Sequence, residues 1–204
     1  ASASAAGCAA VPGAPCFTDQ TLVVPGSAAS ALPPTLASVV SRRVHGAAGT
    51  FDLVLGNLAT NPTTEPRQGP AFTIVFTFDK AVTGGAATVT VGTATVGAVT
   101  FSGNEMRVPL TNVADQQYVT VTVSDVASSD GGTGGGGSVR VGFLKGDANQ
   151  NRVVTFSDDL QVNNVLGQPV TSSNYLKDLN ANGILTFSDN LIVNNQGGRV
   201  LPAP

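Results

Sequence analysis

The segment Asp147-Ala-Asn-Gln-Asn-Arg-Val-Val-Thr-Phe-Ser-Asp158 recurs 31 residues later as Asp178-Leu-Asn-Ala-Asn-Gly-Ile-Leu-Thr-Phe-Ser-Asp189. Acids, amides and hydroxyls keep the same register in both copies, and the match continues past them, for example at Leu160 and Leu191. Unrelated sequence does not hold polar groups in register in this way. We therefore interpret the two segments as copies of one duplicated loop.

The spacing of oxygen-bearing side chains is typical of a twelve-residue calcium loop. Such a loop takes its ligands from positions 1, 3, 5, 7 and 12, with a backbone carbonyl at position 7, and holds Ca²⁺ at about 2.3–2.6 Å. The first loop has Asp147, Asn149, Asn151, Val153 and Asp158 at these positions, and the second has Asp178, Asn180, Asn182, Ile184 and Asp189. The sequence therefore predicts two calcium ions per chain. The alternative is a pair of Asn- and Asp-rich turns that bind no metal.

The two loops differ at position 6, where a calcium loop turns sharply and favours Gly. The second loop has Gly183 there, but the first has Arg152. A non-Gly residue with positive φ costs on the order of 1 kcal/mol. The first loop is therefore expected to be the weaker site, or to be slightly altered in shape.

A helix is expected to follow each loop. The patterns Thr155-x-x-Asp158 and Thr186-x-x-Asp189 place a hydroxyl cap three residues before an acid, which is a helix-start signal. Position 8 is apolar in both copies, as Val154 and Leu185, and can anchor each loop to a small core. Before the first loop, residues 139–144 are expected to form a strand.

Two tandem calcium loops, each followed but not preceded by a helix and each with Asp at position 12, resemble a dockerin module. The resemblance covers about residues 146–199, roughly a quarter of the chain. It implies a calcium-dependent plug that docks onto a partner β-sandwich called cohesin. It also implies docking dyads at loop positions 10 and 11, here Phe156-Ser157 and Phe187-Ser188. The alternative is that both Phe residues belong to the core of the module.

Residues 35–144 contain short β-rich runs separated by Gly- and Asn-containing turn signals. In the clearest run, from Phe72 to Phe78, apolar residues alternate with Thr as in a half-buried strand. Strands are expected at residues 35–42, 50–55, 71–78, 87–91, 93–101, 105–110, 118–123 and 139–144. Roughly eight strands in about 110 residues is the size of an immunoglobulin-like sandwich. The runs 74–82 and 123–131 resemble the bacterial Ig-like domains of surface and adhesion proteins, and the Gly-rich residues 131–138 are expected to form a loop inside the sandwich.

The composition is that of an all-β secreted protein, with 42% hydrophobic but only 11% charged residues and no Trp. The net charge of −3 argues against a nucleic-acid partner. No apolar run approaches the ~18 residues of a membrane span. The initial Ala-Ser-Ala-Ser-Ala-Ala predicts a cleaved export signal, unless the chain starts downstream of its natural beginning. Loops this poor in carboxylates suit the calcium concentrations outside cells, so an extracellular or cell-surface location is expected.

Residues 1–34 are rich in Ala, Ser and Pro and contain both cysteines, Cys8 and Cys16. In an exported chain these two most simply close a small loop by a disulfide, with an intermolecular bridge as the alternative. Residues 17–24 can form one strand. The segment is then a disordered tail, an arm that adds a strand to a neighbouring subunit, or an extra edge strand that Leu22 to Val24 add to their own sandwich.

No catalytic site is evident from the sequence. His45, the one His, is expected to be an exposed polar residue near a strand end. Glu65 and Glu105 are the only glutamates, and no pair of acids outside the loops is placed for acid/base work. The chain is therefore expected not to be an enzyme.

The expected fold is mainly β, with an arm (residues 1–34), an Ig-like β-sandwich (35–144) and a small α-helical dockerin-like calcium-binding module (145–204). Two functions compete. The first is a calcium-stabilised extracellular structural subunit that assembles with copies of itself into a filament or layer through sandwich, arm and dockerin-like contacts. The second is a secreted accessory protein that docks onto a separate cohesin scaffold and binds polysaccharide. The lack of Trp counts against polysaccharide binding, which usually uses exposed aromatic platforms.

Overall fold

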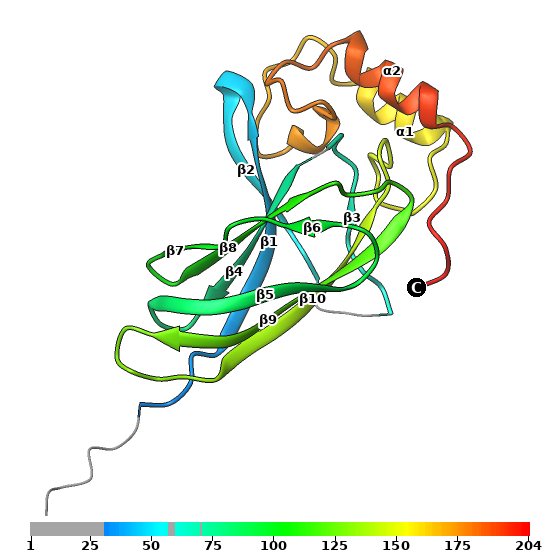
Figure 1. The fold of residues 1–204 in the computed structure, drawn as a ribbon. Coiled ribbons are helices and arrows are strands. Elements are labelled where there is room, and N and C mark those ends of the chain that lie inside the picture. The colour runs from blue at the N-terminus through cyan, green and yellow to red at the C-terminus, as the bar shows by residue number, and fades with distance from the viewer. Residues whose placement is uncertain (1–30, 57–59, 70) are drawn as a thin grey trace, which may run out of the picture.

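The computed structural model describes residues 31–56, 60–69 and 71–204. Within them, two sheets pack face to face as a β-sandwich, and two helices lie beyond one end of it (Figure 1). One sheet has the strand order β2-β1-β4-β8-β6, with β7 also paired to β8, and the other has the order β3-β10-β9-β5. The strands are β1 (Leu36–His45), β2 (Gly49–Val54), β3 (Thr64–Glu65), β4 (Phe72–Phe78), β5 (Val82–Val91), β6 (Thr95–Val96), β7 (Thr100–Ser102), β8 (Glu105–Thr111), β9 (Gln117–Ser128) and β10 (Gly135–Phe143). The mainly β fold predicted from the sequence is therefore confirmed.

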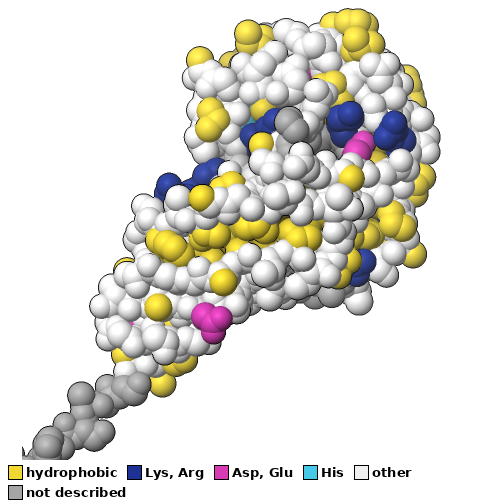
Figure 2. Space-filling model, viewed as in Figure 1, with side chains coloured by type: hydrophobic (Ala, Val, Ile, Leu, Met, Phe, Trp, Pro, Cys, Tyr) yellow, Lys and Arg dark blue, Asp and Glu magenta, His cyan; other side chains and the backbone are white. Residues whose placement is uncertain are grey.

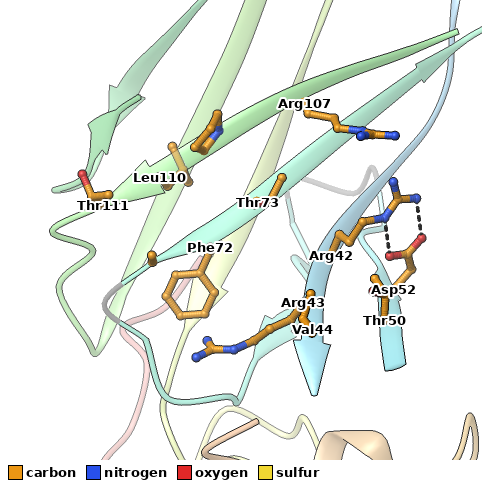
Figure 3. A pocket seen from close by; sticks show the side chains of 12 residues that line it. Arg42, Arg43, Val44, Thr50, Asp52, Phe72, Thr73, Arg107, Leu110 and Thr111 are labelled. Atoms are coloured by element: carbon orange, nitrogen blue, oxygen red, sulfur yellow. Dashed lines mark hydrogen bonds and ion pairs between the residues drawn. The ribbon is translucent and has the colours of Figure 1, made fainter. Parts of the chain in front are cut away.

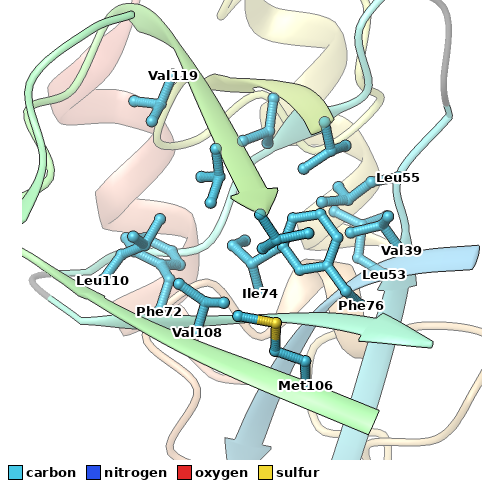
Figure 4. Packing of buried hydrophobic residues seen from close by; sticks show 14 of the residues in the cluster. Val39, Leu53, Leu55, Phe72, Ile74, Phe76, Met106, Val108, Leu110 and Val119 are labelled. Atoms are coloured by element: carbon cyan, nitrogen blue, oxygen red, sulfur yellow. The ribbon is translucent and has the colours of Figure 1, made fainter. Parts of the chain in front are cut away.

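The main core lies between the two sheets. Successive side chains of a strand point to opposite faces, so Phe72, Ile74, Phe76 and Phe78 of β4 all face the core and are buried. Figure 4 shows Ile74, Phe76 and Met106 gathered with Val119 of the opposite sheet. The Thr residues that alternate with them on β4 are only half-buried. The period-2 pattern thus fixes which face of this strand packs inward.

Several details of the sandwich differ from the sequence predictions, and the strands expected at 87–91 and 118–123 are longer than predicted, as β5 and β9. Residues 93–101, expected as one strand, form β6 and β7, because the stretch from Val96 to Thr100 has one residue more than the stretch of β8 that it faces, from Leu110 to Arg107. Both short strands pair with β8. The Gly-rich segment was expected to be a loop throughout, but β10 already begins at Gly135, since the adjacent β9 supplies backbone partners for it.

A short strand that the sequence did not predict, β3, pairs in parallel with the end of β10. Two residues carry no periodic signal, so its existence depends on the neighbouring strand. Its Glu65 O accepts the N–H of Leu144 (3.3 Å), and the nearby Pro66 O accepts the N–H of Gly146 (2.9 Å). β3 and the residues after it therefore anchor the point where the chain leaves the sandwich.

The C-terminal region contains α1 (Phe156–Asn163), the 3-10 helix η2 (Tyr175–Lys177) and α2 (Phe187–Gln196). Each α-helix begins at the expected capping box, formed by Thr155 and Asp158 or by Thr186 and Asp189. The helices lie side by side (Figure 1). A second core of buried residues joins this region to the sandwich end: Tyr118, Leu144, Ala148, Val154, Val162, Leu179, Val193 and Leu201.

The surface carries few charges. Figure 2 shows mostly side chains that are neither charged nor hydrophobic, with a band of hydrophobic side chains across the middle of the visible face. Hydrophobic residues that are only partly buried against the main core include Val89 of β5, Val96 of β6 and Phe101 of β7. In the part of the chain that the structure describes, no helix is both long and apolar enough to cross a membrane.

Candidate metal centre

Both predicted loops fold around their own acids and amides. In the first loop, backbone N–H groups donate hydrogen bonds of 2.9–3.0 Å to side-chain oxygens. Asn151 N and Arg152 N donate to Asp147, Asn151 N also donates to Asn149, Val153 N donates to Asn151, and Asn149 N and Thr155 N donate to Asp158. The second loop has the same hydrogen bonds, at 2.8–3.2 Å. Asn182 N and Gly183 N donate to Asp178, Asn182 N also donates to Asn180, Ile184 N donates to Asn182, and Asn180 N and Thr186 N donate to Asp189. In each loop the N–H of position 5 donates to the side chains of both position 1 and position 3, and the bonds together orient the side chains of positions 1, 3, 5 and 12.

The backbone of each loop makes two left-handed turns. At position 4, Gln150 has φ 62° and Ala181 has φ 56°. At position 6, Arg152 has φ 73° and Gly183 has φ 86°. The first loop therefore has the same conformation as the second although it lacks Gly, and Arg152 bears a strain on the order of 1 kcal/mol. The alternative of an altered loop shape is therefore not seen in these dihedral angles, and weaker ion binding in the first loop stays a prediction.

The four carboxylates of the loops, Asp147, Asp158, Asp178 and Asp189, are all 0% exposed. Burial raises the pKa of Asp147 to about 6, and the charge of Asp158 adds to the effect, against the hydrogen bonds that it accepts. Burial likewise raises the pKa of Asp189, and the charge of Asp178 adds to it. Two buried acids that repel each other are costly unless a cation compensates them. A divalent cation in each loop would remove this cost.

The donor set fits a hard cation. Each loop offers two carboxylates, two Asn amide oxygens and a backbone carbonyl, all of them oxygen donors of the kind that calcium prefers. Groups of three or more His, Cys, Asp or Glu side chains that could hold a metal ion are absent from the described residues. Each loop supplies only two such side chains, so its remaining donors are amides and carbonyls.

The residues at positions 10 and 11 lie on the surface. Phe156 is 76% exposed and Phe187 is 65% exposed. The alternative that these two residues form the core of the C-terminal region is therefore wrong; Val154 and Leu185 are buried there instead. The position 11 hydroxyls are bonded within the loops, since Ser157 accepts from the Asn149 side chain (2.8 Å) and Ser188 from the Asn180 side chain (2.9 Å).

The prediction that His45 is exposed is wrong. The His45 ring is fully buried, and its Nδ1 lies 2.8 Å from Asp178 Oδ2. Its Nε2 lies 3.1 Å from Arg67 Nη1, and Arg67 forms a buried ion pair with Glu65 (2.7 Å). These polar residues connect the sandwich to the second loop. Sequence reasoning missed them because neither periodicity nor spacing marks contacts between residues so far apart in the chain.

A cavity of about 760 Å³ lies on the six-stranded sheet and is lined by no residue of either loop (Figure 3). Arg42, Asp52 and Arg107 of its lining form ion pairs, whereas Arg43 lies over the Phe72 ring, 5.2 Å from its centroid. Arg42 bonds both Asp52 and Glu105 at 2.8 Å, and Arg107 bonds Glu105 at 2.7 Å. The Arg partners lower the pKa of Glu105. The cavity therefore offers an ion-paired surface, and we assign no catalytic role to its acids.

Cys8, Cys16 and the predicted strand at residues 17–24 lie outside the described residues. Their disulfide and their pairing stay predictions. Comparisons of the chain with protein-family models, with curated proteins and with solved structures found no match.

Proposed function

We propose that the chain is a non-enzymatic, calcium-stabilised structural subunit of an extracellular assembly. The observation that carries this proposal is the pair of loops whose identical hydrogen bonds surround buried, mutually repelling carboxylates. One ion would be held by Asp147, Asn149, Asn151, Val153 and Asp158, and the other by Asp178, Asn180, Asn182, Ile184 and Asp189. When bound, calcium neutralises the acids and so stabilises the C-terminal region.

In this proposal, residues 145–204 form a dockerin-like module and residues 35–144 an Ig-like sandwich. The exposed Phe156 and Phe187 support a docking role, because each is followed one helical turn later by an exposed Leu, Leu160 (47% exposed) or Leu191 (45% exposed). Residues four apart lie on the same helix face. Each helix therefore presents an apolar pair of the kind that partner proteins cover.

The partner that we favour is the sandwich of a neighbouring copy. A plug at one end and a sandwich at the other can join head to tail, and a heterologous contact that does not close produces a filament. The alternative partner is a separate cohesin scaffold, to which the chain would attach as an accessory protein. The exposed apolar pairs are compatible with both partners, so the state of assembly of the purified protein distinguishes them.

A second contact is strand addition by residues 17–24 of a neighbouring copy. β2 and β5 lie at the edges of their sheets. Their side chains Val54 (67% exposed) and Val91 (52% exposed) leave apolar surface uncovered there. An added strand would satisfy the backbone groups of such an edge. Deleting residues 1–25 tests this contact, since polymers that persist without them would exclude the arm as connector.

The proposal is tested by metal analysis and electron microscopy of the native protein. We expect two calcium ions per chain and polymers that depend on calcium. Chelation is expected to melt the residues after Gly146 and to leave the sandwich largely folded. Zero or one ion contradicts the two-site proposal, whereas two ions with isolated particles favour the accessory protein.

The docking surface is tested by Phe187→Ser. Because Phe187 is exposed, we expect calcium binding and folding to stay unchanged while association is lost. A matched control is Val200→Ser, which alters an exposed apolar residue (46% exposed) of the C-terminal region outside both helices. If a variant with both Phe187→Ser and Phe156→Ser still associates, the dyads are not part of the contact.

A further inference from the structure

Asp178, the first residue of the second loop, is held by a side chain of the sandwich. His45 ends β1, and the 2.8 Å contact from its Nδ1 to Asp178 Oδ2 joins residues 133 positions apart. Both side chains are 0% exposed. Position 1 of a calcium loop supplies a carboxylate ligand. The sandwich therefore fixes one oxygen of the proposed second site.

The hydrogen-bond partners decide which nitrogen of His45 carries the proton. Arg67 Nη1 faces Nε2 at 3.1 Å, and a guanidinium can only donate. Nε2 must then accept, and Nδ1–H donates to Asp178. Arg67 is itself held by two bonds of 2.7 Å to Glu65 and one of 2.9 Å to Ser41 O. The direction of the Nδ1–H bond is therefore set by a buried network inside the sandwich.

This network adds a donor beside the loop without adding net charge. Glu65 and Arg67 balance each other, and His45, with one N–H, is neutral. The network therefore adds no net positive charge that would compete with a cation in the loop. The first loop has a different neighbour, since the ammonium of Lys177 donates to Ala148 O and senses the charges of the carboxylates there.

The ring and the loop backbone have little freedom to move. His45 meets Phe51 edge-on at 5.3 Å and Tyr175 edge-on at 5.9 Å, and these two rings stack on each other at 5.2 Å. A Cβ on Gly183 would lie 2.5 Å from His45 O, and a Cβ on Gly46 would lie 2.0 Å from the carbonyl oxygen of residue 182. The second loop is therefore in direct backbone contact with the end of β1.

We propose that His45 is a positioning residue of the second calcium site, which makes ion binding in that loop depend on its contact with the sandwich. The inference rests on the proposed function. Removing a hydrogen-bond partner that orients a metal ligand typically lowers the affinity for the metal by about 10- to 100-fold. Binding in the second loop should fall by a factor of this size when the Nδ1–H bond is removed, and binding in the first loop should not change.

The test uses the full chain with Asp147→Asn, which leaves the second loop as the main site. Three variants separate the two ring nitrogens. His45→Phe keeps an aromatic ring but removes both nitrogens, His45→Asn places an amide N–H near the Nδ1 position, and His45→Gln reaches the Nε2 position instead. Calorimetric titration with calcium gives the affinity, and urea unfolding without calcium gives the stability of the metal-free protein.

We expect His45→Phe and His45→Gln to weaken binding by about 10- to 100-fold and His45→Asn to stay close to the parent. The same variants in an Asp178→Asn background should leave the first loop unchanged. If the Phe variant does not fold, the comparison of Asn with Gln decides. Equal calcium affinities in all variants overturn the positioning role. The role is also overturned if both loops lose calcium affinity in proportion to the loss of stability of the metal-free protein. A parent protein that binds no calcium overturns the proposed function itself.

Discussion

The two loops have the same twelve-position pattern and the same internal hydrogen bonds, but they have different neighbours. The second loop lies against the end of β1, where His45 and Gly46 contact it. The first loop lies against the C-terminal tail, where Val154 N donates to Arg199 O (2.8 Å) and Leu201 N donates to Arg152 O (3.0 Å). It also contacts β3 of the sandwich, since the Gln150 side chain donates to Thr64 O (2.6 Å). The two copies thus have the same internal geometry, whereas their tertiary surroundings make them unequal.

The difference extends to strain and charge. The first loop adopts a positive φ at Arg152, and Lys177 brings an ammonium close to its carboxylates. The second loop has Gly183 at the turn and a neutral ring beside its first acid. A cation lies near each loop, because Arg43 is close enough to Asp178 for the charge of that acid to oppose the lowering of the Arg43 pKa by burial. The backbone strain at Arg152 is therefore the difference that disfavours ion binding in the first loop. We expect the second loop to be the tighter site, and four changes test this ranking.

The largest effect is expected from Gly46→Ala. The new Cβ would overlap the carbonyl oxygen of Asn182, and Gly46 also has φ 46°. Overpacking of about 1–3 kcal/mol and backbone strain of about 1 kcal/mol should together lower the free energy of unfolding by about 3 kcal/mol, measured in urea. Gly167→Ala is the control, because Gly167 has φ 76° with open space around it, and it should cost about 1 kcal/mol. Equal losses would show that the contact with β1 is loose.

The next effect compares acids between the loops. A site held at about 100 times its Kd contributes about 2.7 kcal/mol to stability. When calcium is present, Asp178→Ala or Asp189→Ala should remove most of the stability that the bound ion contributes. Asp147→Ala should remove less, because the first loop is expected to bind calcium more weakly. Calorimetric titration of each single variant gives the remaining affinity. Equal losses from both loops would mean that Arg152 is tolerated without strain.

A pH dependence is expected from Asp147 in calcium-free protein. Its pKa of about 6 in the folded chain lies above the ordinary 3.8, so the folded state takes up the proton first. Stability should therefore rise as pH falls from about 6 to about 4, by on the order of 1 to 2 kcal/mol after allowance for solvent screening. The difference in unfolding free energy between parent and Asp147→Asn isolates this contribution. With calcium present the sign should reverse, because proton and ion compete; a flat difference in both conditions would refute the assignment.

The smallest effect is expected from Arg152→Gly. Relief of the positive φ should strengthen ion binding in the first loop by about 1 kcal/mol, or roughly fivefold in Kd. Arg152→Ala keeps the strain and removes only the positive charge, so it serves as the matched control. Calcium titration in an Asp178→Asn background reports on the first loop alone. If Ala improves binding as much as Gly, charge rather than backbone strain separates the loops.

Local sequence was sufficient for features that depend on neighbouring residues. Spacing alone predicted the loop positions, the capping boxes at Thr155 and Thr186, and the special turn shared by Arg152 and Gly183. These depend on hydrogen bonds that span at most about a dozen residues, so the pattern contains the information. Alternation of apolar residues with Thr predicted β4 for the same reason, since every second residue of a strand lies on the same face.

The tertiary structure decided what spans the chain. His45 is polar and ends a strand, so the sequence predicted exposure, yet it is buried because loop residues 133 positions later cover it. The Glu65–Arg67 pair and β3 were missed likewise, since their partners come from other elements. Burial of a charged group is settled by which distant atoms compensate it. The sequence by itself determined two similar loops, and only the packed structure attached them to different strands of the sandwich, the first to β3 through Gln150 and the second to β1 through His45.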